Sequence, residues 1–166
     1  NRVLAMGEEP WRVCTAGFPV IDLFKSGDYA LLGELNRRFG IDPDRPLIVF
    51  TQHSVTTEFD RARPQVEASL QAMRRAAEEG IQVLLTYPNN DAGGRVIIEA
   101  LEEFAAQGIE GVSLHRSMGR FGYHGALALA LDANRRIACA GNSSSGIKET
   151  PAFGCPTVNI GSRQDG

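Results

Sequence analysis

Short apolar runs alternate with longer amphipathic stretches along this chain, and that alternation limits the possible fold more than any other feature. The runs are apolar at consecutive positions, which is typical of strands buried on both faces of a parallel sheet. Strand–helix–strand order favours right-handed crossovers and an open, doubly wound α/β sheet with helices on both faces, a Rossmann-like three-layer fold. The predicted strands are Arg12–Thr15, Leu47–Thr51, Gln82–Thr86, Gly111–Leu114, Arg136–Ala140 and Thr157–Ile160.

The stretches between these runs place apolar residues three and four positions apart, as amphipathic helices do. This spacing predicts helices over Arg61–Glu79, Gly94–Gln107 and Tyr29–Phe39. A glycine, which commonly ends a helix, directly follows each of these ranges. A further helix is expected to begin near Ser145.

The chain of 166 residues is long enough for one domain with a full hydrophobic core. Residues 1–10 do not fit the alternating pattern, and we interpret them as the tail of a preceding helix and a linker. Residues 11–166 then form the nucleotide-binding domain. Because the chain begins with Asn1 and stops just after a predicted strand, we expect it to be a piece of a longer protein.

Charge and composition argue against several classes of partner. The net charge is −3 and no basic run occurs, so nucleic acid is not an expected partner. No apolar run could span a bilayer and no signal peptide opens the chain, so we expect a cytoplasmic protein without a membrane partner. Cys14, Cys139 and Cys155 lack the spacing of metal ligands, and we predict buried thiols in a reducing compartment and no metal site.

Polar residues gather directly after the predicted strands. Parallel sheets bind ligands beyond the carboxyl ends of their strands, so these segments are expected to meet at one edge. The segments are Gln52–Glu58, Tyr87–Gly94, His115–Gly119, Gly141–Gly146 and Gly161–Gln164.

The segment Gly141–Gly146 reads GNSSSG and has the clearest chemistry. The glycines allow a tight turn, and Ser143, Ser144 and Ser145 offer hydroxyls next to the free N–H groups of a helix N-terminus, which together suit an anion such as phosphate. A single serine that merely caps the helix is the alternative.

Three other side chains are candidates for the same edge. Glu149 lies one helical turn beyond the serines, where a carboxylate could accept hydrogen bonds from ribose hydroxyls or simply favour the helix dipole. His53 could act as an acid, a base or a phosphate ligand, or serve only as a surface or capping residue. Arg163 could pair with a diphosphate or with another lobe, or remain a solvated charge.

Four motifs together resemble the UDP-N-acetylglucosamine 2-epimerases, most closely the hydrolysing branch that feeds sialic-acid and related nonulosonic-acid synthesis. They are TAGFPVID (15–22), QHSVTTE (52–58), YPNNDAGG (87–94) and GNSSSGIKETPAFGCPTVNIGSRQ (141–164). The resemblance runs from about Arg12 to the end. Two features depart from the pattern: Ser54 stands where a proline is usual, and the segment 123–135 is longer than expected.

The resemblance implies a GT-B enzyme with two Rossmann-like lobes, of which this chain is the C-terminal, UDP-binding lobe. It implies that Ser143, Ser144, Ser145 and Gly146 meet the diphosphate and that Glu149 meets the ribose. It also implies a catalytic role for His53, active-site positions for Asn89 and Arg163, and a nucleotide-facing position for Ser117.

The implied reaction has two stages and needs no metal or organic cofactor. Anti-elimination of UDP gives 2-acetamidoglucal, and addition of water then gives N-acetylmannosamine and free UDP. The base at C2 is expected on the absent N-terminal lobe, and the full-length enzyme is expected to form a homo-oligomer. Two alternatives stay open: a GT-B glycosyltransferase lobe, and a nucleotide-binding module that is inactive in isolation.

Overall fold

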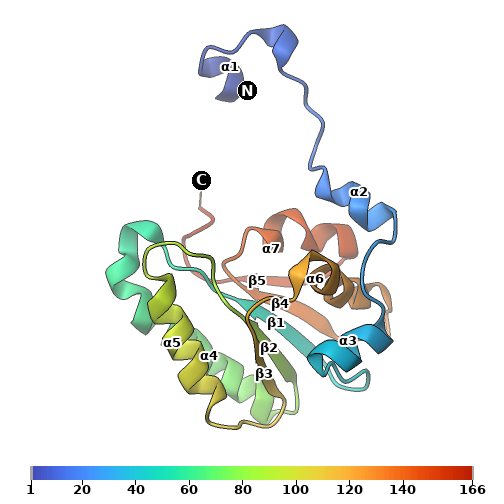
Figure 1. Cartoon of the computed structure of the whole chain (residues 1–166), viewed down its shortest axis with the longest axis vertical. Coiled ribbons are helices and arrows are strands. Elements are labelled where there is room, and N and C mark those ends of the chain that lie inside the picture. The colour runs from blue at the N-terminus through green and yellow to red at the C-terminus, as the bar shows by residue number, and fades with distance from the viewer. Residues whose placement is uncertain (1, 166) are drawn as a thin grey trace.

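A computed structural model describes residues 2–165 and shows a parallel sheet with helices on both faces (Figure 1). All neighbouring strands pair in parallel, in the order β3-β2-β1-β4-β5. The strands are β1 (Leu47–Thr51), β2 (Gln82–Thr86), β3 (Val112–His115), β4 (Ile137–Gly141) and β5 (Thr157–Asn159). The expected Rossmann-like α/β class is confirmed.

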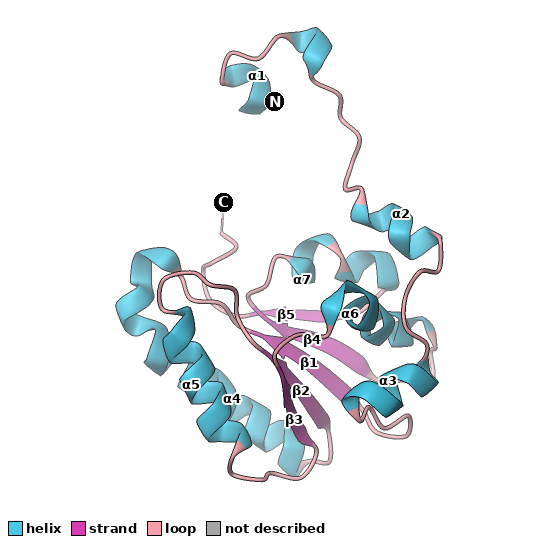
Figure 2. Cartoon of the chain, viewed as in Figure 1, coloured by secondary structure: helices cyan, strands magenta, loops and turns pink. Residues whose placement is uncertain are grey.

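The helices form two layers around this sheet, as Figure 2 shows. One face carries α4 (Ala62–Glu78) and α5 (Gly94–Ala105), and the other carries α3 (Leu32–Phe39), α6 (Gly119–Ala128) and α7 (Ser145–Lys148). The chain also forms α1 (Arg2–Ala5), α2 (Val20–Lys25) and 3₁₀ turns at Pro10–Arg12, Thr56–Arg61, Leu129–Leu131 and Thr150–Phe153. None of the helices in the described part of the chain is long and apolar enough to cross a bilayer.

The predicted strand Arg12–Thr15 is wrong. Pro10–Arg12 is a 3₁₀ turn, and the segment that follows is irregular and lies away from the sheet (Figure 1). It has no strand to pair with, and its residues are exposed except Val13, which is only partly buried. Cys14 is exposed for the same reason, whereas Cys139 and Cys155 are buried as predicted.

Other elements were predicted imprecisely. The helix expected over Tyr29–Phe39 begins only at Leu32, and α2 and α6 were not predicted. The sequence of α6 contains Gly119, Gly122 and Gly125, and its polar residues do not gather on one face. The spacing typical of an amphipathic helix is therefore absent. The long segment 123–135 is therefore the second half of α6 followed by the turn Leu129–Leu131.

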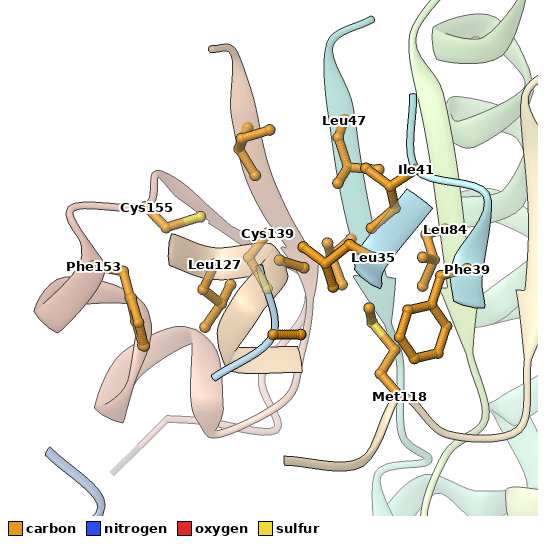
Figure 3. Packing of buried hydrophobic residues seen from close by; sticks show 14 residues of the cluster. Leu35, Phe39, Ile41, Leu47, Leu84, Met118, Leu127, Cys139, Phe153 and Cys155 are labelled. Carbon is orange, nitrogen blue, oxygen red and sulfur yellow. The ribbon is translucent and has the colours of Figure 1, made fainter. Parts of the chain in front are cut away.

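Alternate side chains of the strands point into two separate hydrophobic cores. Leu47 and Val49 of β1 face the α3/α6 side, whereas Phe50 faces the α4/α5 side. Figure 3 shows the first core, where Leu35, Phe39 and Leu127 reach the sheet from the helices. Burial on both faces is what the continuous apolar runs predicted.

Gly141, the last residue of β4, allows β4 to lie against the end of β1. Its φ is +129°, and a Cβ atom there would overlap the carbonyl oxygen of Thr51. Any amino acid with a side chain would be strained at this backbone angle and would clash with the Thr51 carbonyl. The glycine thus fixes where the loop after β4 begins.

We therefore expect Gly141→Ala to lower the free energy of unfolding by about 3 kcal/mol, since it adds overpacking to a strained backbone angle. Urea denaturation would measure the loss. Gly33→Ala is the matched control, because Gly33 lies exposed in α3 with no atom near its missing side chain, and it should raise stability by roughly 0.5–1 kcal/mol. Equal stabilities for the two variants would contradict the role given to Gly141.

Candidate functional site

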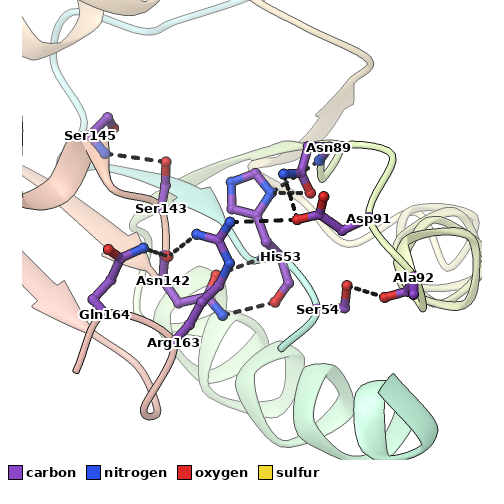
Figure 4. Close-up of polar contacts among 10 residues, drawn as sticks. All are labelled: His53, Ser54, Asn89, Asp91, Ala92, Asn142, Ser143, Ser145, Arg163 and Gln164. Carbon is purple, nitrogen blue, oxygen red and sulfur yellow. Dashed lines mark hydrogen bonds and ion pairs between the residues drawn. The ribbon is translucent and has the colours of Figure 1, made fainter. Parts of the chain in front are cut away.

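The carboxyl ends of the parallel strands meet at one edge, and the predicted polar segments lie there together. β1 and β2 end at Thr51 and Thr86, which are partners in register and whose hydroxyls are hydrogen-bonded at 2.5 Å. The loops that follow β1, β2, β4 and β5 all contribute to the contacts drawn in Figure 4. The expected convergence is therefore confirmed for these loops.

Asn142 joins the loop after β4 to the loop after β1. Its side-chain Oδ1 accepts the backbone N–H of His53 at 2.7 Å, and its Nδ2 donates to the backbone carbonyl of His53 at 2.8 Å. The side chain is buried, with an exposed fraction of 3% for the residue. Such a two-way amide pair fixes both position and orientation of the His53 backbone.

The His53 ring is oriented by the loop after β2. Nδ1 lies 3.0 Å from the backbone N of Asn89 and 3.1 Å from the side-chain oxygen of the same residue. A backbone nitrogen always carries its hydrogen, so in the neutral ring Nδ1 accepts and the proton sits on Nε2. Nε2 makes no hydrogen bond to any residue from 2 to 165, so its N–H is available to a ligand.

Burial lowers the pKa of His53 below its ordinary value of 6.5, and the positive charge of Arg163 lowers it further. The Asn89 oxygen and the carboxylate of Asp91 act in the opposite direction but do not outweigh these effects. The ring is therefore neutral near pH 7, with one proton to donate from Nε2.

Ser54 forms a second hydrogen bond between the loop after β1 and the loop after β2. Its hydroxyl donates to the carbonyl of Ala92 at 2.5 Å, and the residue is 1% exposed. A proline at this position would have no hydroxyl for this contact. The departure from the usual pattern is thus compensated here by a hydrogen bond.

Arg163 reaches back across the edge from the segment after β5. Nη1 donates to the carbonyl of Asn142 at 3.1 Å, and Nη2 lies 3.7 Å from the carboxylate of Asp91 (Figure 4). Gln164 donates to the same carbonyl at 2.8 Å. Arg163, Asn89 and His53 are therefore brought together, as the sequence motifs predicted.

The serine loop differs from the expected helix N-terminus in one respect. α7 begins at Ser145 but ends at Lys148, so it is a single turn with little macrodipole. The anion-binding capacity comes instead from local donors: the backbone N–H groups of Ser143 and Ser144 have no hydrogen-bond partner within residues 2–165. Ser143 Oγ accepts a long bond of 3.4 Å from the N–H of Ser145, and Ser145 Oγ is hydrogen-bonded to the hydroxyl of Tyr123.

Gly146 is required by packing rather than by its backbone angle. A Cβ atom there would lie 2.8 Å from the Cγ2 methyl of Thr157 in β5. The glycine therefore lets α7 lie close against the edge strand.

Two pockets lie on either side of this loop. The first, of about 370 Å³, is lined by residues at or after the ends of β1, β2, β3 and β4 and by residues of α2 and α6 and at the two ends of α7. Its lining comprises Val20, Thr51, His53, Thr86, Tyr87, Arg116, Ser117, Met118, Gly119, Arg120, Tyr123, His124, Ser143, Ser145 and Glu149. The second, of about 460 Å³, is lined by Val55, Thr56, Thr57, Glu58, Asp91, Ser144, Ser162, Arg163 and Gln164.

The predicted residues thus divide between these pockets. His53, Ser117, Ser143, Ser145 and Glu149 share the first, which suits a nucleotide with a phosphate end and a polar hydroxyl-bearing end. Ser144 and Arg163 face the second pocket instead. Asn89 lines neither pocket but contacts the ring of His53.

Comparison with known proteins decides the family. The sequence model of the family described as UDP-N-acetylglucosamine 2-epimerase matches residues 1–166. The chain belongs to this epimerase family.

Three relatives of this chain are named as 2-epimerases of nucleotide sugars. It is 30% identical over 165 residues to the UDP-N,N′-diacetylbacillosamine 2-epimerase (hydrolyzing) of Legionella pneumophila, covering 99% of this chain and 41% of that protein. It is 27% identical over 166 residues to the GDP/UDP-N,N′-diacetylbacillosamine 2-epimerase (hydrolyzing) of Campylobacter jejuni, covering 100% of this chain and 41% of that protein. It is 31% identical over 164 residues to the UDP-N-acetylglucosamine 2-epimerase of Neisseria meningitidis, covering 99% of this chain and 40% of that protein.

Several residues of the candidate site were not identified from the sequence. Asn142 lies inside GNSSSG, but nothing in the sequence distinguishes it from a solvent-exposed loop asparagine until its contact with His53 is known. Arg120, Tyr123 and His124 were missed because α6, which carries them, was not predicted. Arg116 lies in the predicted polar segment His115–Gly119, but no role was assigned to it. Arg116 lines the first pocket, and within residues 2–165 no carboxylate forms an ion pair with it, so it adds positive charge there.

We expect Asn142→Ala to lower the free energy of unfolding by about 2 kcal/mol, because it leaves the N–H and carbonyl of His53 without partners. Chemical denaturation would measure the change. Asn90→Ala, at an exposed position without a side-chain hydrogen bond in the described chain, should stay within about 0.5 kcal/mol of the parent. A loss no larger for Asn142 than for Asn90 would refute the locking role.

We expect the His53 ring to titrate below 6.5 when its proton resonances are followed by NMR against pH. Arg163→Gln should raise the midpoint and Asp91→Asn should lower it, because these residues carry the opposing charges. The unfolded chain binds this proton more tightly than the folded one, so the fold also loses stability as pH falls below about 6.5. A midpoint that neither substitution moves would show that the two charges do not act on the ring.

Proposed function

We propose that the full-length protein is a hydrolysing UDP-N-acetylglucosamine 2-epimerase and that this chain is its UDP-binding, C-terminal GT-B lobe. The observation that carries the proposal is the first pocket, in which Ser143 and Ser145 of the serine loop line one cavity with His53 and Glu149. The chain spans about 41% of the length of two relatives with hydrolysing names, and this supports a second lobe in the whole protein.

The diphosphate of UDP is proposed to bind at the serine loop. The unpartnered N–H groups of Ser143 and Ser144, the Ser143 and Ser145 hydroxyls and the positive charge of Arg116 all favour an anion there. Gly146 lets the turn that carries these donors lie close against β5. The serines on the two sides of the loop could thus hold the two phosphates from different directions.

The nucleoside is proposed to extend towards α6. Glu149 lies in the wall of the pocket with 20% of its side chain exposed, and a carboxylate can accept hydrogen bonds from both hydroxyls of a ribose. Ser117, in the loop between β3 and α6, lines the same cavity and would face the nucleotide.

His53 is proposed to assist the departure of UDP. In the first step a base removes the proton from C2 of the sugar, the bond from C1 to the phosphate oxygen breaks, and 2-acetamidoglucal forms. Negative charge then grows on the leaving diphosphate, and the Nε2–H of a neutral His53 can donate to it. In the second step water adds its oxygen at C1 and a proton at C2, giving N-acetylmannosamine.

The remaining parts of the site are proposed to complete the cleft between two lobes. Asn89 orients His53, and Arg163 with Ser144 lines the second pocket, where the other lobe would meet this one. The base at C2 is assigned to that lobe. The full-length protein is proposed to be a homo-oligomeric, cytoplasmic enzyme of sialic- or nonulosonic-acid synthesis.

The substrate class follows from the names of the relatives. One is named for UDP-N,N′-diacetylbacillosamine, one for GDP/UDP-N,N′-diacetylbacillosamine and one for UDP-N-acetylglucosamine. A UDP-linked N-acetylated hexosamine is common to these names and is proposed as substrate. Both sugar nucleotides therefore belong in the assay.

We expect the full-length protein to convert at least one of UDP-N-acetylglucosamine and UDP-N,N′-diacetylbacillosamine to free UDP and the 2-epimeric sugar. His53→Gln should lower kcat by roughly 10²- to 10⁴-fold with little change in KM, because it removes a proton donor needed mainly in the transition state. Chromatography of the products, with coupled detection of UDP, measures both.

Asn90→Gln, an exposed change near the site, is the control and should leave both constants unchanged. Two outcomes would contradict the proposal. Recovery of both sugar nucleotides unreacted would remove the epimerase activity, and transfer of the sugar to an acceptor without any free sugar would indicate a glycosyltransferase.

A further inference from the structure

His124 is a buried polar residue that the proposed reaction does not use. It lies in α6 and is 2% exposed, with its ring 5.5 Å from that of Phe153 and 6.5 Å from that of Tyr123. A polar side chain in such apolar surroundings lowers stability unless it is hydrogen-bonded. Its position therefore calls for a partner.

That partner is Glu149. Nε2 of His124 lies 3.2 Å from Oε2 of Glu149, and Nδ1 is buried without any hydrogen-bond partner in the described chain. A proton on Nδ1 would be a buried donor with no acceptor, so the ring proton belongs on Nε2, which donates to the carboxylate. In this hydrogen bond His124 is therefore the donor and Glu149 the acceptor.

The contact leaves half of the Glu149 carboxylate free. Within residues 2–165, His124 is the only side chain or backbone group that hydrogen-bonds to this carboxylate. Oε2 is held from the side of α6, and Oε1 remains available to the pocket that both residues line. An unheld glutamate at the end of a one-turn helix would otherwise sample several rotamers.

We propose that His124 is a positioning residue that holds the Glu149 carboxylate in the orientation that receives ribose hydroxyls. This inference rests on the proposed function, because it takes the pocket ligand to be a nucleoside diphosphate. Immobilising one long side chain on binding costs about 0.5–1.5 kcal/mol, which corresponds to roughly a 2- to 13-fold change in Kd. His124 removes that cost by fixing the side chain before the ligand arrives.

The test compares His124→Met with His124→Gln in the full-length protein. The two replacements have similar length and volume, but only glutamine keeps an N–H donor that can reach Glu149. Calorimetry measures Kd for UDP, 2′-deoxy-UDP and 3′-deoxy-UDP. The wild type should prefer UDP, His124→Met should reduce that preference several-fold, and His124→Gln should largely restore it.

Ser143→Ala is the control for a change elsewhere in the pocket. It should raise the Kd of all three ligands by the same factor, because it removes a contact to the diphosphate and none to the ribose. A general loosening of the fold by His124→Met would likewise weaken all three equally, and would leave the preference unchanged.

The outcomes separate this inference from the proposed function. If the wild type binds no UDP, or binds all three ligands equally, the nucleotide assignment or the role of Glu149 is wrong. If the wild type prefers UDP and His124→Met keeps the full preference, the role of His124 is overturned. Should the variants fail to fold, nitrogen-15 NMR of the wild type decides, since a proton on Nδ1 instead of Nε2 would also overturn it.

Discussion

The pairing of the Asn142 side chain with the backbone of His53 holds the candidate site together. The two residues follow different strands, β1 and β4, and are 89 positions apart in the sequence. Gly141 brings the strand ends close enough for the contact, and Arg163 and Gln164 then bind the carbonyl of Asn142 from the segment after β5. One buried amide thereby sets the relative positions of a histidine, an arginine and a serine loop.

Much of this arrangement could be predicted from the sequence because parallel sheets obey strong rules. Continuous apolar runs indicated the buried strands, and the rule that ligands bind at their carboxyl ends placed His53 and the serine loop at one edge. The rule failed for Arg12–Thr15, where a short apolar run has no strand beside it. A propensity for strand has no effect without a pairing partner.

The wall of the pocket could not be predicted in the same way. Helix α6 carries glycines where it packs closely against neighbours, so its sequence lacks a polar face and its residues were not placed. His124 therefore had no assigned surroundings, although it is buried and contacts Glu149 in the wall of the pocket. Asn142 was overlooked for a different reason, since a single amide gives no signal until its partner is known.

The sheet divides the molecule into a face that carries the pocket and a face that mainly carries stability. The core beneath α4 and α5 holds Phe50, Val66 and Leu101, none of which lines the first pocket, whereas α6 and α7 contribute to its wall. Effects of substitutions in separate cores tend to add. Changes in packing beneath α4 and α5 nevertheless reach the first pocket through Tyr87, which packs against that core and also lines the cavity.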